Sequence, residues 1–141
     1  MSDATGSVPS TSAGDPLPGF DGLIGTVFDE LDPERVVAHL DLAPRHHQPF
    51  GIVHGGVYCS LVELVGSVAG SLNAPEGKVV VGVNNNTHFL ASMSEGRVVA
   101  TATPISRGRT QQLWNVDVVR ESDGRLVATG QLRLQAIDAR G

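Results

Sequence analysis

The sequence predicts an α+β domain in which one long helix packs against an antiparallel sheet. One run of apolar and small residues, over 57–72, is long enough for about four helical turns and contains no Pro, Asn or Asp. Four strand-like segments follow this run without any further helical pattern. Asp123-Gly124 between the last two is a typical two-residue hairpin signal.

The residues before the helix predict a tail and a hairpin. Residues 1–18 are mostly Ser, Thr, Gly, Pro and Asp, and we expect them to form a disordered or draped tail ahead of a domain over 19–141. The segment 36–42 alternates strictly, with apolar side chains at every second position, which is typical of a half-buried strand. We expect residues 20–31 to be its hairpin partner.

The second half of the chain predicts a sheet with an exposed edge. Residues 73–77 stop the helix, and strands are expected over 78–90, 97–105, 110–120 and 125–137. Because the helix is apolar nearly all round, we expect the sheet of five or six strands to wrap it. One helix cannot cover every face and edge of such a sheet, which favours self-association.

Glu63 is the one residue that does not fit the apolar helix. It lies between Leu61-Val62 and Leu64-Val65, and no Lys or Arg occurs between Arg45 and Lys78 to pair with it. Burial disfavours a charged carboxylate, so a buried Glu requires a reason. Two interpretations stay open: a Glu at an exposed helix edge or bonded to a nearby Ser, and a catalytic carboxylate in a buried pocket.

Composition excludes several classes of function. The net charge of −5, with 10 scattered basic residues, argues against nucleic acid as a partner. The single cysteine, Cys59, excludes an internal disulfide and cysteine-based zinc sites. Neither a membrane-spanning run nor a secretory leader is evident, so we expect a cytoplasmic protein without a membrane partner.

Three histidines precede or open the helix. His46, His47 and His54 lie in a loop without nearby carboxylates, which is a weak zinc pattern, and we expect no metal. We expect His54 to shape the turn into the helix, and His46 and His47 to lie at the mouth of the site.

The string Gly51-Ile52-Val53-His54-Gly55-Gly56, followed by Glu63, resembles the hotdog-fold acyl-CoA thioesterases. The resemblance is to the branch that includes the Arthrobacter-type 4-hydroxybenzoyl-CoA thioesterase and the phenylacetate-pathway thioesterase. It covers about residues 20–137 and includes Tyr58-Cys59 and Gly82 with Asn85. It implies a long central helix wrapped by a five- to six-stranded antiparallel sheet.

The resemblance also implies catalytic roles. Glu63 matches the family's nucleophile or general base, and Gly55 matches the glycine whose N–H polarises the thioester carbonyl. Gln48 matches an orienting group, and Ser67 stands where relatives carry a water-holding Thr. The family builds each site from two subunits, so we expect a homodimer as the minimal active unit and a homotetramer as the assembly.

Further residues are expected to bind substrate. The set comprises His54, Gly56, Asn84, Asn86, His88, Arg107, Arg109 and Thr110, with Gln111 and Gln112 beside it. Arg107 and Arg109 suit CoA phosphates, although a charged hairpin turn explains them equally well. Where the family often has Arg-Pro, this chain has Ala91-Ser92, which removes one expected phosphate contact.

The chemistry agrees with these roles. A thioester carbonyl gains negative charge on attack, and free N–H groups at a helix start stabilise such charge. We therefore expect hydrolysis of a small or medium acyl-CoA, aromatic acyl groups included, with no cofactor beyond the CoA of the substrate. The alternative is a non-catalytic acyl-CoA-binding protein of the same fold. A hotdog hydratase is disfavoured because its Asp/His motif is not found.

Overall fold

The computed structural model describes residues 11–139 and has the α+β architecture that the sequence predicts. The elements, in chain order, are α1 (Gly19–Ile24), β1 (Val27–Asp32), β2 (Arg35–Leu42), a 3₁₀ turn (Pro44–His46), α2 (Gly55–Leu72), β3 (Lys78–Phe89), β4 (Gly96–Arg107), β5 (Gln111–Arg120) and β6 (Leu126–Asp138). The single long helix and the strands after it are confirmed, with most bounds within two residues of those expected.

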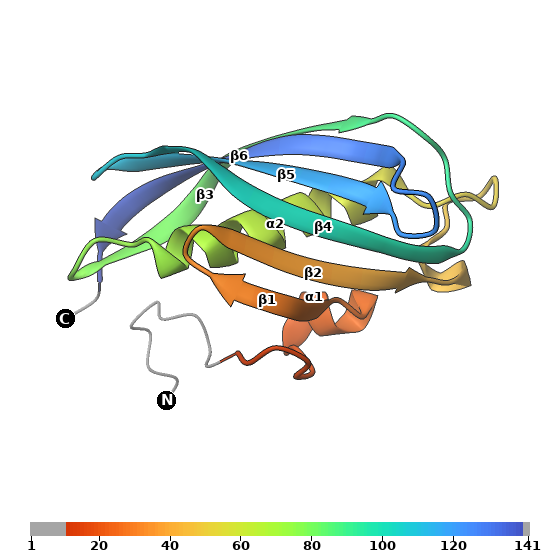
Figure 1. The fold of residues 1–141 in the computed structure, drawn as a ribbon, viewed down its shortest axis with the longest axis horizontal. Helices are drawn as coiled ribbons and strands as arrows, with labels where there is room; N and C mark the ends of the chain where they lie inside the picture. The colour runs from red at the N-terminus through yellow and green to blue at the C-terminus, as the bar shows by residue number, and fades with distance from the viewer. Residues whose placement is uncertain (1–10, 140–141) are drawn as a thin grey trace.

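One antiparallel sheet contains all six strands, in the order β1-β2-β4-β5-β6-β3. The sheet curves around α2, which runs along its inner face (Figure 1). β3 is hydrogen-bonded only to β6, so one of its edges has no partner strand within the described residues. Val81 and Val83 on this strand are 41% and 53% exposed, which is unusual for apolar side chains in the centre of a long strand.

The core lies between α2 and the inner face of the sheet. Leu61, Val62 and Val65 of the helix are fully buried, as are Trp114 and Leu132 of the sheet. The sheet wraps one face of α2, as expected, and the opposite face is not covered within the described residues. That face carries Cys59, Ser60, Glu63, Leu64 and Ser67, which are exposed or half-buried.

α2 also has the length and mean hydropathy of a membrane span. Half of its 18 residues are buried inside the domain and one is a glutamate, which identifies it as the core helix of the fold.

A β-bulge in β3 decides which side chains face the helix. Gly82 pairs with Leu134 and Asn84 pairs with Arg133, so Val83 is the extra residue. After the bulge, Asn85, Thr87 and Phe89 pair with Leu132, Gly130 and Ala128 and share their face, toward α2. Asn84, Asn86 and His88 therefore lie on the outer face of the sheet.

The N-terminal region differs in part from expectation. The hairpin partner of β2 is β1, over 27–32, whereas residues 19–24 form the short helix α1, which the sequence analysis did not predict. Ahead of it, Gly14 donates its N–H to the Phe28 carbonyl at 2.8 Å, and Leu17 packs against the core. The part of the expected tail over 1–10 lies outside the described residues.

Candidate active site

The N-terminus of α2 presents an unused hydrogen-bond donor. His54 is the N-cap, and its Nδ1 accepts the Gly56 N–H at 2.8 Å. The Gly55 N–H, by contrast, has no hydrogen-bond partner among residues 11–139. Free N–H groups at the start of a long helix carry its positive partial charge, so Gly55 is positioned to bind an anion or a polarised carbonyl.

A cavity of about 350 Å³ opens beside this donor. Gln48 and Gly55 both line it, which brings two of the predicted catalytic residues together. The Gln48 Oε1 accepts the Phe50 N–H, which leaves its amide nitrogen as the group available to donate. The other lining residues are uncharged and mostly apolar: Ile52, Val53, Tyr58, Phe89, Leu90, Ala91 and Ser92.

The absence of a side chain at Gly55 leaves room for an aromatic ring beside the backbone. The Phe89 ring lies against this position, and a Cβ at residue 55 would be 2.6 Å from two of its carbons. The same ring contacts Tyr58, with centroids 6.1 Å apart. Tyr58 is only 2% exposed, and its hydroxyl has no hydrogen-bond partner in the described part of the chain.

Glu63 lies in a second cavity, of about 420 Å³. Phe20 and Asp21 of α1 form one wall, and Cys59, Ser60 and Asn85 complete it. The Asn85 Nδ2 donates to the Glu63 Oε1 at 3.3 Å. Partial burial raises the pKa of the Asp21 carboxyl above its usual value.

Of the two interpretations left open for Glu63, the single chain fits the exposed helix edge, since this side chain is exposed there. The cause is that α2 meets its own sheet with the opposite face. Ser60 does not bond the carboxylate, because its hydroxyl donates to the Gly56 carbonyl at 2.7 Å. Ser67 is half-buried one turn beyond Glu63, outside the residues that line this cavity.

The two cavities cannot act on one substrate carbonyl within one chain. Gly55 and Glu63 are eight residues apart on a single straight helix, a rise of about 12 Å. The donor and the carboxylate therefore meet only if they come from different chains.

Three residues predicted to bind substrate lie away from Glu63. Asn84, Asn86 and His88 are on the outer sheet face, and the last two line a polar cavity of about 160 Å³ there. The single chain does not bring them near either cavity beside α2.

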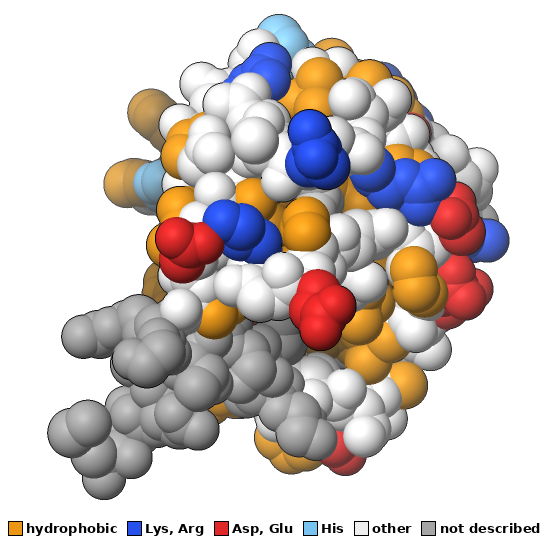
Figure 2. All heavy atoms as spheres, turned by 90° about the vertical axis from the view of Figure 1, so that its left-hand side faces the viewer, with side chains coloured by type: hydrophobic (Ala, Val, Ile, Leu, Met, Phe, Trp, Pro, Cys, Tyr) orange, Lys and Arg blue, Asp and Glu red, His pale blue; other side chains and the backbone are white. Residues whose placement is uncertain are grey.

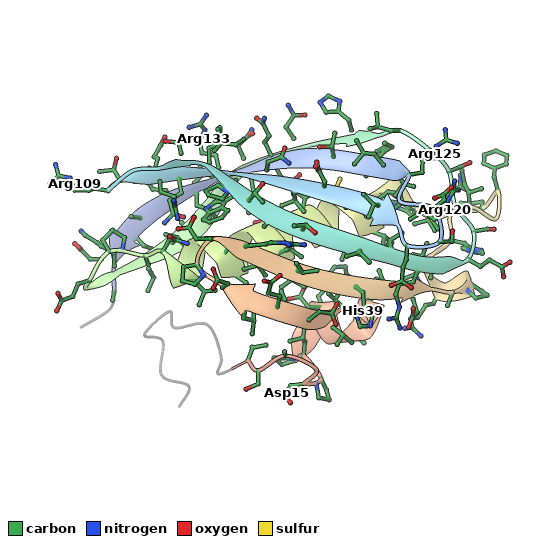
Figure 3. The ribbon with its side chains drawn as sticks, viewed as in Figure 1. Asp15, His39, Arg109, Arg120, Arg125 and Arg133 are labelled. Atoms are coloured by element: carbon green, nitrogen blue, oxygen red, sulfur yellow. The ribbon has the colours of Figure 1, made fainter. Side chains whose placement is uncertain are left out.

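The basic residues of the β4–β5 turn differ in their surroundings. Arg107 is paired with Glu34 at 2.6 Å. Arg109 makes no hydrogen bond or ion pair within residues 11–139, and it points away from the molecule at the tip of the turn (Figure 3). Thr110 beside it is exposed. Lys and Arg side chains gather at this end of the molecule (Figure 2).

Gln112 and His46 have structural roles, contrary to expectation. Gln112 is 3% exposed; it accepts the Trp114 indole N–H and donates to the Gly70 carbonyl near the end of α2. His46 is 2% exposed and joins the Ala43 N–H to the Ile24 carbonyl, so it does not lie at the mouth of a site. His47 bonds the Ser94 carbonyl at 2.6 Å.

Two features of the Glu63 cavity are not evident in the sequence: the wall that α1 supplies and the contact from Asn85. Gly19–Ile24 is too short to show helical periodicity. Asn85 was noted only as a point of resemblance, since neighbouring asparagines do not reveal which one faces the helix. The bulge at Gly82 was the available signal, because a Gly inside a strand pattern often marks one.

The chain is similar in sequence to known thioesterases. The Thioesterase superfamily matches residues 50–127. Rv1847 of Mycobacterium tuberculosis is 50% identical over 124 residues, which cover 86% of this chain and 88% of Rv1847. The proofreading thioesterase EntH of Cronobacter sakazakii is 34% identical over 77% of this chain and 79% of its own length.

A solved structure agrees with the fold. The thioesterase HI1161 of Haemophilus influenzae superposes with a TM-score of 0.80 at 36% identity, over 86% of this chain and 84% of HI1161. With a hotdog arrangement of sheet and helix, a match over most of the domain and relatives at this identity, the chain belongs to the Thioesterase superfamily.

Proposed function

We propose that the protein hydrolyses acyl-CoA thioesters to the free acid and CoA. The observation that carries this proposal is the unpaired Gly55 N–H at the start of α2, facing a cavity that Gln48 also lines. Two donors directed at one oxygen stabilise the charge that a thioester carbonyl develops on attack. The family membership supports a hydrolase, and the acyl-CoA substrate is part of the proposal.

The proposed active unit is a dimer in which each site uses two chains. One copy supplies Gly55 and Gln48, and the other supplies Glu63, because the two sets are about 12 Å apart along α2 of one chain. The open edge of β3, with Val81 and Val83 exposed, is the surface proposed for pairing of the copies. Association along this edge would also cover part of the exposed face of α2.

The reaction has two routes that use the same residues. As general base, Glu63 removes a proton from water; the hydroxide adds to the carbonyl carbon, the C–S bond breaks, and CoA leaves as the thiolate. As nucleophile, a Glu63 oxygen adds to the carbonyl, expels the CoA thiolate and leaves a mixed anhydride, which water hydrolyses. Neither route requires a metal. A single turnover in oxygen-18 water separates them, because only the anhydride route can place the label in Glu63.

The first test is release of CoA thiol from a panel of aliphatic and aromatic acyl-CoAs. Removing the carboxylate should leave little turnover, so Glu63→Gln is expected to lose at least about 1000-fold in kcat while the fold and oligomer persist. Wild-type turnover in Glu63→Gln would reject the role of Glu63. Tight binding of acyl-CoA without any thiol release by the wild-type protein would favour the non-catalytic alternative.

A second test isolates the Gly55 N–H. Proline fits the first position of a helix, and the extended backbone of His54 is compatible with a following proline. Gly55→Pro removes the N–H, whereas Gly55→Ala keeps it and places a similar Cβ against Phe89. We expect Gly55→Pro to be slower than Gly55→Ala by about 100- to 1000-fold. Equal rates would remove Gly55 from the mechanism.

Mixing inactive chains tests the shared site. In a hybrid dimer of Glu63→Gln and Gly55→Pro chains, one of the two sites has both native residues. Random pairing should therefore restore about a quarter of wild-type activity per chain. If no activity returns although hybrid dimers form, the site is not divided between chains in this way.

The proposed contact for the CoA phosphates is a basic side chain at the β4–β5 turn. Arg109, which has no partner in the described structure, is the candidate contact for CoA phosphates, whereas Arg107 is engaged by Glu34. The cavity beside Gly55 carries no basic side chain, in keeping with Ala91-Ser92 at its rim. The branch with 4-hydroxybenzoyl-CoA and phenylacetate-pathway enzymes, the homotetramer and the cytoplasmic location stay predictions.

A further inference from the structure

We propose that Asn85 and Thr87 are positioning residues that hold the Glu63 carboxylate in a fixed orientation. The inference rests on the proposed function. It assigns to β3 a role that neither the sequence motif nor the family resemblance gave it, and the three residues form a chain of hydrogen bonds across the gap between β3 and α2.

The orientation of the Asn85 amide is determined by its partners. The Thr87 hydroxyl donates to the Asn85 Oδ1 at 2.7 Å. This directs Nδ2 to the helix, where it donates to the Cys59 carbonyl at 3.0 Å and to the Glu63 Oε1 at 3.3 Å. A flipped amide would place an oxygen against both the carbonyl and the carboxylate, so only one orientation satisfies all three contacts.

Two glycines provide the room for this arrangement. A Cβ at Gly82 would overlap the Glu63 Oε2, so the carboxylate is confined between the Asn85 amide and the bare backbone of β3. A Cβ at Gly130 would be 2.7 Å from the Thr87 hydroxyl and 2.9 Å from Val62. Thr87 can therefore direct its hydroxyl at Asn85 only because β6 has no side chain at the paired position.

Such a device matters for an acid on an exposed helix face. A free glutamate samples several rotamers, and misplacement of a reacting group by about 1 Å can cost about 100-fold in rate. The contact with Asn85 leaves Oε2 without a hydrogen-bond partner in residues 11–139, and this oxygen is the one proposed to reach water or the carbonyl.

The test compares substitutions along the hydrogen-bond chain. We expect Asn85→Leu to lower kcat about 10- to 100-fold with KM within about threefold, because the carboxylate keeps its chemistry and loses its orientation. Thr87→Val should lower kcat in the same direction by a smaller factor. Thr87→Ser keeps the hydroxyl and should restore wild-type kcat.

Thr129→Val is the matched control. Thr129 also donates its hydroxyl at 2.7 Å, to Asp117, but on the outer face of the sheet. A loss of kcat in Thr87→Val that exceeds the loss in Thr129→Val, with rescue by Thr87→Ser, supports the proposal. Equal kcat for all three threonine variants, or wild-type kcat for Asn85→Leu, would overturn it. If Asn85→Leu does not fold, the comparison of Thr87→Val with Thr87→Ser decides.

These outcomes are separable from those of the proposed function. An inactive Glu63→Gln with a fully active Asn85→Leu would reject the positioning role and leave the thioesterase proposal standing. An active Glu63→Gln would reject the role of the carboxylate itself, whatever the β3 variants do.

Discussion

At the scale of single residues, Gly82 determines where the catalytic acid can lie. Its missing side chain is the space that one Glu63 oxygen occupies. The residue is in the bulge of β3, where the backbone passes close to α2. Gly82 interrupts an apolar strand, and its lack of a side chain makes room for the Glu63 carboxylate.

Gly82→Ala tests this arrangement. The added methyl group should displace the carboxylate from Asn85, and we expect kcat to fall about 10- to 100-fold. Loss of stability should be small, since alanine is not disfavoured relative to glycine in a strand and Gly82 does not have a positive φ. Steady-state kinetics beside thermal unfolding separate the two effects. Unchanged kcat would show that Glu63 does not need this space.

Tyr58 gives a prediction about pH, since it is the single tyrosine of the chain. Burial raises its pKa above the ordinary value, so folding favours the neutral phenol. The unfolded chain then loses this proton first, and the contribution of Tyr58 to stability, full below about pH 10, is lost as pH rises through the folded pKa. Tyrosinate absorbance should appear only well above pH 10, together with unfolding.

Tyr58→Phe is the companion variant. Removing a buried hydroxyl without a partner should raise the free energy of unfolding by about 1 kcal/mol, measured with urea. A lower unfolding free energy would show that the hydroxyl has a partner in the assembled protein.

Residue roles were only partly predictable from the sequence. The Gly55-Gly56 pair and Glu63 stand out because glycine at a helix start and an acid in an apolar run are rare. Which face of α2 is covered depends on packing with the sheet, so the sequence could not decide between an exposed and a buried Glu63. His46 looked like a loop residue, yet two backbone groups far apart in sequence hold it in the interior.

At the scale of elements, β3 is the strand with most consequence for function. It carries Gly82 and Asn85 on the face toward α2, and it exposes a free edge. Its exposed valines are apolar surface of the kind that marks an interaction site.

Val83→Lys tests the edge. A charged side chain on an edge strand opposes pairing with a second copy, so we expect the variant to be monomeric and at least about 10-fold less active. Sedimentation and thiol release measure the two properties, and circular dichroism reports whether the sheet remains. A dimeric, active Val83→Lys would place the dimer interface elsewhere.

The elements themselves were largely predictable because period-two alternation and turn residues mark the strands. Two features were not. α1 has six residues with two glycines, too few to show a period. The bulge in β3 reverses the alternation after Gly82, so Asn85 and Thr87 face the helix where a regular strand would present Asn84 and Asn86.

At the scale of the whole molecule, the single chain is an incomplete enzyme in our proposal. The exposed face of α2 adjoins the open edge of the sheet, since Asn85 of the edge strand β3 contacts Glu63 on that face. If dimerisation completes the site, folding and association are coupled.

Thermal unfolding should then depend on protein concentration. We expect the midpoint to rise by a few degrees for each tenfold increase in concentration, because binding of a second copy stabilises only the folded chain. Activity per chain should fall on dilution in parallel. A midpoint that is constant over a hundredfold range for the wild-type protein would argue for a stable monomer, and sedimentation checks this.

The buried Trp114 provides a built-in optical probe for such experiments. It is the single tryptophan of the chain, and through the Gln112 amide it is linked to the Gly70 carbonyl near the last turn of α2. Its fluorescence should therefore shift to the red when that end of the helix undocks, even if the strands persist. Stopped-flow measurement of Trp114 emission after dilution of the protein would therefore give the rate at which the helix end undocks, independently of any enzymatic assay.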